Sequence, residues 1–207
     1  RAAEAGLRVF SCVWAWLRAV RCKAWLRKVA PFAAGVAVAG VAAAALNYAR
    51  FGRPEEFGHT YLQVYWRDRI ERWGLFNYHY LGRNLAVFLT SLPWLSASPP
   101  YVMVSRHGLA LWVTTPNLLA VFWPKKTSLA ALALGLSAAT VALVNLCYQN
   151  SGWIQFGYRF ALDYMPVLFV LLAIGGRRFG RGFWALAVLS VLVNAFGAVT
   201  FDRAGSY

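Results

Sequence analysis

Long apolar runs separated by short charged clusters dominate this chain. The runs 29–49 and 129–147 contain no Asp, Glu, Lys, Arg or His, and further, shorter apolar runs follow them. About 20 predominantly apolar residues in an α-helix cross the ~30 Å hydrocarbon core of a bilayer. The pattern therefore predicts an all-α integral membrane protein with about five transmembrane helices, at residues 30–48, 108–123, 128–147, 160–175 and 183–201.

Interfacial amphipathic helices are predicted beside these spans. In residues 1–28, Val and Trp side chains fall on a rough helical stripe, while Lys and Arg supply the polar side. This is the pattern of a helix that lies on anionic lipid headgroups, and a solvated linker is the alternative. We expect a cytoplasmic juxtamembrane amphipathic helix at 1–28 and a transmembrane region at 29–207.

The stretch 81–106 is the ambiguous part of the pattern. It is apolar only over 85–95, and Pro93, Pro99 and Pro100 interrupt or follow that run. Apolar runs of 10–14 residues are more typical of interfacial or re-entrant segments than of spans. We therefore predict that 81–106 does not cross, which makes 48–106 one long loop on the outer side.

The distribution of charge supports the same topology. Without a crossing at 81–106, 12 of the 21 Lys and Arg residues lie on one side: seven in 1–28, two at 125–126 and three at 177–181. Cytoplasmic loops carry an excess of Lys and Arg, so this side is assigned to the cytoplasm, together with the N-terminus. All acidic residues except Glu4 then lie on or near the outer face.

Composition excludes several classes of protein. Of 207 residues, 60% are hydrophobic and only 14% are charged, whereas soluble domains carry roughly a quarter charged residues. The net charge of +14 does not indicate nucleic-acid binding, because the charges sit at the ends of apolar runs rather than along one soluble face. The chain begins with Arg1 rather than Met, which suggests a piece of a longer polypeptide.

Metal and disulfide chemistry find little support in the sequence. Cys12, Cys22 and Cys147 are odd in number and scattered, so neither a disulfide framework nor a zinc site is indicated. The three histidines are isolated in sequence. No cofactor is identified, and a divalent metal is possible but unsupported.

The first segment that could carry chemistry runs from Asn47 to Gly82 in the outer loop. Arg50 lies at the turn where the chain leaves the first span, and Glu55 and Glu56 follow close to it. These three residues are candidates for substrate binding. A surface salt bridge is the plainer alternative for the two glutamates, and anchoring at the membrane interface is the plainer role for the Tyr and Trp residues.

The second segment, Asn150 to Pro166, connects two predicted spans. Arg159 and Asp163 are four residues apart, so on an α-helix they would share a face. Ionisable groups at a membrane helix end are expensive unless they face protein or water, which makes them functional candidates; a structural pair is the alternative. Arg159 suits a phosphate, and the remaining candidates for the same pocket are Trp153, Gln155 and Tyr158.

The two segments carry a resemblance to a known family. The stretches NYARFGRPEEFGHTY, HYLGRNLAVFL, HGLALWVTTPNLL and SGWIQFGYRFALDYMPVLFVLLA resemble the C-terminal half of bacterial GT-C glycosyltransferases, which are related to protein O-mannosyltransferases and aminoarabinose transferases. The resemblance implies sugar transfer from a polyprenyl-phosphate donor on the non-cytoplasmic side of the bacterial inner membrane. It also implies a cation for the donor phosphate, which fits Arg159 or Arg50.

The same resemblance implies a catalytic carboxylate that this chain lacks. In the family it usually lies in the first outer loop, preceded by several spans, and no such segment is present here. Glu55 and Glu56 cannot be assumed to replace it, so the catalytic residue is unknown. Two alternatives remain open: a transporter of polyprenyl lipid or small solutes, and a non-catalytic membrane subunit. The oligomeric state is unknown.

Overall fold

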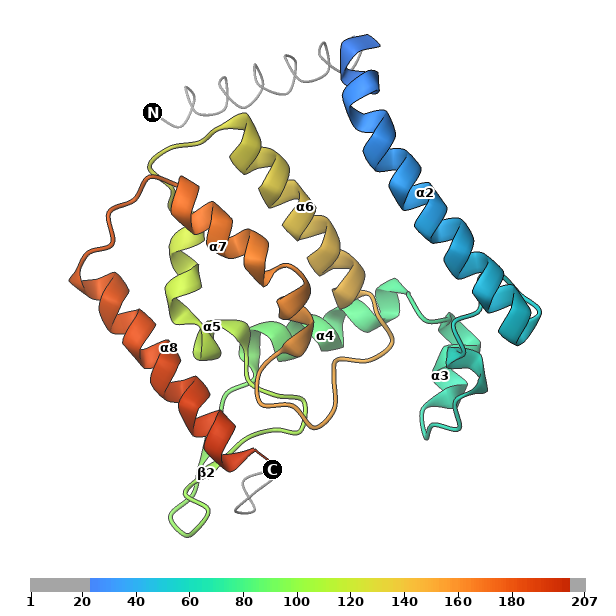
Figure 1. Ribbon diagram of the computed structural model, residues 1–207. Coiled ribbons are helices and arrows are strands. Elements are labelled where there is room, and N and C mark those ends of the chain that lie inside the picture. The colour runs from blue at the N-terminus through green and yellow to red at the C-terminus, as the bar shows by residue number, and fades with distance from the viewer. Residues whose placement is uncertain (1–22, 202–207) are drawn as a thin grey trace. The chain divides into compact units, whose positions relative to one another are not determined.

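A computed structural model describes residues 23–201 (Figure 1). The predicted amphipathic helix at 1–28 therefore lies largely outside the described residues. The chain divides into two compact units, one ending at Arg67 and one beginning at Asp68. Each unit is described by itself below.

The first unit is built on one long helix. Helix α2 (Lys23–Phe51) has 29 residues and includes the predicted first span, 30–48. Residues 23–28, which were predicted to belong to a separate juxtamembrane helix, are continuous with it in the described part of the chain. Gly52, with φ of +71°, ends the helix in the left-handed conformation that glycine adopts at helix C-termini. A 3-10 helix, η1 (His59–Tyr61), follows.

The second unit contains the remaining elements in a mostly helical order. They are α3 (Arg67–Trp73), which begins at the unit boundary, then η2 (Tyr78–Tyr80), α4 (Leu81–Thr90), β1 (Trp94–Leu95), β2 (Val102–Met103), α5 (Leu111–Thr114), η3 (Pro116–Phe122), α6 (Leu129–Leu146), η4 (Arg159–Asp163), α7 (Met165–Ile174) and α8 (Arg181–Thr200). Strands β1 and β2 pair antiparallel, with Trp94 opposite Met103. The stretch 81–106 thus holds a ten-residue helix and a short hairpin, and no helix of spanning length.

Three helices in the described part are long and apolar enough to span a membrane, rather than five. They are Leu26–Phe51, Leu129–Leu146 and Arg181–Thr200, which correspond to the predicted spans 30–48, 128–147 and 183–201. The other two predicted spans, 108–123 and 160–175, are not continuous helices.

A proline marks each of the two interruptions. In 108–123, Pro116 lacks the N–H that would continue α5, so the chain changes from a four-residue α-helix to the 3-10 helix η3 at Thr115. In 160–175, Pro166 stands at the first turn of α7, a position that begins a helix. The residues before it form the separate 3-10 helix η4, which leaves α7 only ten residues long.

The helices of the second unit pack around the broken segment. Helix α7 lies against α6 on one side and η3 on the other, and α8 packs on η3 and α5; α6, α7 and α8 are seen in Figure 1 with α5 among them. The buried core consists of Leu111, Ala138, Tyr158, Ala161 and Tyr164. The outward faces of the long helices are apolar and exposed, as lipid-facing surfaces are.

Candidate functional site

The connecting segments of the second unit meet at the C-terminal end of α6. Asn84 of α4 is fully buried there, and its side-chain amide donates to the carbonyl oxygens of Leu146 (2.9 Å) and Tyr148 (2.7 Å). The last carbonyls of a helix have no partner within the helix. Asn84 supplies that partner from more than 60 residues away, and it fixes α4 against the end of α6.

Arg83 reinforces the same junction. Its Nη2 donates to the carbonyl of Gln149 at 2.6 Å, so a cation lies near the negative end of the α6 dipole, where it is stabilised. Burial lowers the pKa of Arg83, and the charge of Arg69 lowers that pKa further. Three buried atoms here have no hydrogen-bond partner among the described residues: Arg83 Nε, Asn84 Oδ1 and Gln149 Oε1.

A second junction ties residues 105–109 to residues 151–157. The His107 Nδ1 lies 2.9 Å from the hydroxyl of Ser151 and 3.2 Å from the carbonyl of Gly152. The Gln155 amide donates to the carbonyls of His107 (2.6 Å) and Ser151 (3.1 Å). Ser151 is only 1% exposed, so its hydroxyl holds the two loops together and is closed to a substrate.

Glycine is required at two positions of this junction. Gly152 has a φ of +96°, and a Cβ there would lie 2.1 Å from the Gln155 Oε1. Gly108 has a φ of +84°, and its Cβ would lie 2.8 Å from the carbonyl of Gly157. Both the backbone conformation and the close approach exclude larger residues, so the two loops are sterically matched.

Trp153 lies at the exposed surface of this junction. Its side chain is about half exposed, and its ring meets the His107 ring edge-on at 5.1 Å. The guanidinium of Arg106 lies 5.6 Å from the Trp153 ring centre, within range of a cation–π contact. The pair offers an aromatic face and a cation side by side. Arg106 and His107 were not among the predicted residues, because their partners lie more than 40 positions away in the sequence.

Gln155 and Tyr158 are buried, unlike surface ligand groups. Gln155 is occupied by the loop junction described above. Tyr158 packs in the core against Phe88 and Phe160, and its hydroxyl has no partner in the described part of the chain. Burial raises the pKa of Tyr158 to about 12, so the phenol stays protonated at neutral pH and cannot act as a base.

Arg159 and Asp163 are exposed but do not pair. They lie at the two ends of η4, a 3-10 helix, in which residues four apart no longer share a face. Asp163 instead accepts a hydrogen bond at 2.8 Å from Asn145, which also donates to the carbonyl of Phe160. The Arg159 guanidinium lies 5.4 Å from the Phe160 ring centre and is open to a ligand.

Of the three predicted candidates in the first unit, Arg50 and Glu55 are exposed, whereas Glu56 is buried in a turn. Glu55 forms an ion pair with Arg53 at 3.8 Å, with both side chains 71% exposed, which agrees with the plainer alternative of a surface salt bridge. Glu56 is buried and accepts hydrogen bonds from the Thr60 hydroxyl (2.6 Å) and the Gly58 amide (2.6 Å). Arg50 is exposed, 5.4 Å from the Phe51 ring centre.

The basic loops of the second unit meet at the other end of α6. The amides of Lys125 and Lys126 donate to the carbonyl of Gly175 at 2.9 Å and 3.0 Å. The Nε of Arg177 donates to the carbonyl of Trp123 at 2.7 Å. Loops 124–127 and 175–181 therefore lie together, a helix length away from the junctions at the C-terminal end of α6.

The fold defines the chain as a predominantly helical membrane protein with three helices of spanning length in its described part. No group of three or more His, Cys, Asp or Glu side chains within residues 23–201 is placed to hold a metal ion. Comparisons with models of protein families, with curated proteins and with solved structures give no match.

Proposed function

We propose that this chain is the membrane portion of a GT-C type glycosyltransferase that takes its sugar from a polyprenyl-phosphate donor on the non-cytoplasmic side of the bacterial inner membrane. The observation that carries the proposal is the separation of the two ends of α6. The aromatic and polar connecting segments 105–109 and 147–163, called the connectors below, gather at one end. The loops 124–127 and 175–181, which carry Lys and Arg, gather at the other end. By the positive-inside rule the second end is cytoplasmic, so the N-terminus is cytoplasmic as well.

The two interrupted segments also run between the two ends of α6. Segment 108–123 is joined to the connector end through the Leu109 amide, which donates to Phe156, and to the basic end through Trp123. Segment 159–175 is joined to the same two ends through Asp163 and Gly175. Backbone that is not α-helical is tolerated at membrane depth where protein buries it, and Leu118 and Ala161 are buried.

The connector end has the chemistry that a lipid-linked sugar requires. Trp153 offers a ring face of the kind on which sugars stack, and Arg106 and Arg159 offer guanidinium groups that match phosphate oxygens.

Binding of the donor tests the proposal directly. The probe is a radiolabelled polyprenyl-phosphate-mannose, titrated onto the purified full-length protein in nanodiscs. Loss of one charge-assisted contact costs about 1.5–3 kcal/mol, so Arg159→Ala and Arg106→Ala are each expected to weaken binding by about tenfold or more. Arg178→Ala, a cation at the opposite end, is the matched control and is expected to bind like the wild type.

Two outcomes would contradict the proposal. Equal binding by the wild type, Arg159→Ala and Asp163→Ala would remove the donor site from η4. Transport of the lipid or of a solute by the purified protein in vesicles, without binding of the sugar-linked donor, would favour the transporter alternative.

A further inference from the structure

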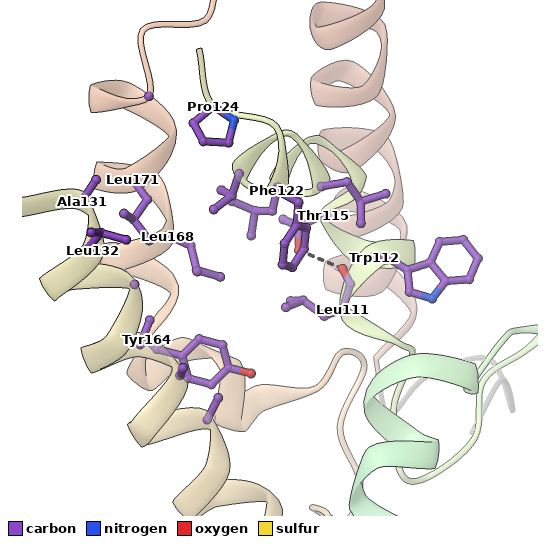
Figure 2. A pocket seen from close by; sticks show the side chains of 18 of the residues that line it. Leu111, Trp112, Thr115, Phe122, Pro124, Ala131, Leu132, Tyr164, Leu168 and Leu171 are labelled. Carbon is purple, nitrogen blue, oxygen red and sulfur yellow. Dashed lines mark hydrogen bonds between the residues drawn. The ribbon is translucent and has the colours of Figure 1, made fainter. Parts of the chain in front are cut away.

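An apolar cavity lies along one face of α6, lined from Lys126 at the basic end to Ala142 (Figure 2). Its volume is about 520 Å³, and its walls come from α4, α5, η3, α6 and α7. Among the lining residues the side chains of Trp112, Thr115, Lys126, Thr127 and Tyr164 carry polar atoms, and the Trp112 Nε1 donates to the carbonyl of Leu89 at 2.7 Å. The hydroxyl of Thr115 donates to the carbonyl of Leu111 at 3.0 Å, so this donor is already satisfied without a ligand. The middle of the cavity suits a hydrocarbon.

The length of the cavity matches one leaflet of a bilayer. On α6 its wall extends from Ala131 to Ala142, which is roughly 17 Å at the helical rise of 1.5 Å per residue. Half of a ~30 Å hydrocarbon core is about 15 Å. The wall therefore accommodates an acyl chain of a single leaflet, and Tyr164 and Leu111 of the buried core stand at the far end.

The near end of the cavity is strongly cationic. Lys126 lines it, and its aliphatic stem is held close to Gly176, where an added Cβ would lie 3.0 Å from the Lys126 Cδ. Arg177 and Lys125 belong to the same pair of loops. From residue 72 to residue 201 the sequence contains a single acidic residue, Asp163, and it is bonded to Asn145 near the other end of α6. The positive charge at this end is therefore unbalanced.

We propose that this cavity is a binding site for an anionic phospholipid of the leaflet on the Lys and Arg side, with one acyl chain along α6 and the headgroup phosphate at Lys126. Three observations favour this ligand: the apolar wall, its length of about one leaflet, and the uncompensated cations at the open end of the cavity. Basic pockets between transmembrane helices on the cytoplasmic side are suited to acidic headgroups. The proposal does not rest on the glycosyltransferase assignment, since the headgroup site at Lys126 lies at the opposite end of α6 from the connectors. Only the acyl-chain part of the cavity extends toward Tyr164, which follows Asp163 in the sequence.

Photo-cross-linking in nanodiscs tests the proposal. The probes are phosphatidylglycerol and phosphatidylcholine, each with a diazirine near the end of one acyl chain, in a phosphatidylcholine bilayer around the full-length protein. In the wild type, mass spectrometry is expected to locate the phosphatidylglycerol label within 131–142 of α6, at Tyr164 and within 165–171 of α7. The phosphatidylcholine probe is expected to label these residues several-fold less.

Paired variants separate the two parts of the site. A Cβ at Gly135 meets open space, so Gly135→Leu fills the cavity without a backbone clash and is expected to reduce labelling about tenfold. Leu136→Phe, on the exposed side of α6, is its control and leaves labelling unchanged. Lys126→Gln is expected to lower labelling by the phosphatidylglycerol probe to that of the phosphatidylcholine probe. Lys125→Gln, outside the cavity lining, is expected to keep most of the preference for phosphatidylglycerol over phosphatidylcholine.

Three outcomes would overturn the proposal. They are equal labelling by both lipids in the wild type, unchanged labelling in Gly135→Leu, and displacement of phosphatidylglycerol by polyprenyl phosphate at lower concentration than by unlabelled phosphatidylglycerol. If Gly135→Leu does not elute as folded protein in size-exclusion chromatography, Ala139→Leu fills the same wall and decides the question.

Discussion

At the scale of single residues, the sequence identifies which residue types are unusual but not which are exposed. Gln155 and Tyr158 were predicted beside Trp153 as one ligand pocket, and only Trp153 is substantially exposed. The reason is that the partner of Gln155 is His107, 48 positions earlier. A local pattern contains no information about such a partner. The predicted ligand role of these residues stays a prediction.

The hydrogen bonds of Glu56 predict that the stability of the turn at 52–61 depends on pH. Its pKa is lowered, first by the hydrogen bond from the Thr60 hydroxyl and then by the amides of Gly58 and Thr60, and desolvation opposes this only partly. A carboxyl whose pKa is lower in the folded state stabilises the fold above its unfolded pKa, ~4.5, and loses that effect as the pH falls through the folded pKa. We expect the turn at 52–61 to loosen as the pH falls from 6 toward 3.

Hydrogen exchange of peptides covering 52–61, corrected for the intrinsic pH dependence of exchange, measures this effect. Glu56→Gln is expected to exchange faster than the wild type at pH 6 and to lose the pH dependence. Glu55→Gln, which removes only an exposed ion pair, is expected to behave like the wild type because such pairs contribute little. Equal protection in all three proteins at pH 6 would show that Glu56 does not hold the turn.

At the scale of elements, continuous apolar runs predicted three spanning helices correctly and failed where proline interrupts the run. Pro116 and Pro166 are visible in the sequence, and both now mark element boundaries. What the sequence could not supply is the packing that keeps the broken pieces in place. Polar side chains provide it, as Ser190 donates to Asn117 at 2.8 Å and Asn194 donates to the carbonyl of Thr114 at 2.8 Å.

These two contacts predict how α8 is held against α5 and η3. Hydrogen bonds between membrane helices contribute ~0.6 kcal/mol on average and up to ~1.7 kcal/mol. The double variant Ser190→Ala, Asn194→Ala is therefore expected to lower the free energy of unfolding by about 1–3 kcal/mol, measured by denaturant titration in mixed micelles. The matched control is Ser137→Ala, whose hydroxyl bonds only within its own helix. A double variant as stable as this control would contradict the prediction.

At the scale of the whole molecule, charge distribution predicted which loops belong together. Loops 124–127 and 175–181 meet through Gly175, and the connectors meet at the opposite end of α6. The sequence contained this information because every Lys and Arg cluster near a span restricts the topology. It did not contain the shape of the space between the helices, which depends on how far the broken segments stand apart.

Cysteine accessibility in intact cells tests the proposed sidedness. With the native cysteines replaced, Arg106→Cys is expected to react with a membrane-impermeant maleimide without permeabilisation, since Arg106 is exposed at the connector end. Lys125→Cys is expected to react only after permeabilisation. Reaction of both from outside the cell would place the two ends in one compartment, and the proposed donor site would then be excluded.

The shortness of α7 has a consequence for the membrane itself. Ten residues rise only about 15 Å, roughly half of the hydrocarbon thickness. Asp163 nevertheless bonds to Asn145, one residue before the end of α6, so η4 and Tyr164 complete the distance that α7 leaves open. In the proposed topology this stretch that is not α-helical would lie at the edge of the hydrocarbon, where a bilayer becomes thinner or admits water. Reactive groups placed there would meet a phosphate that is still anchored by its tail, without first extracting the lipid.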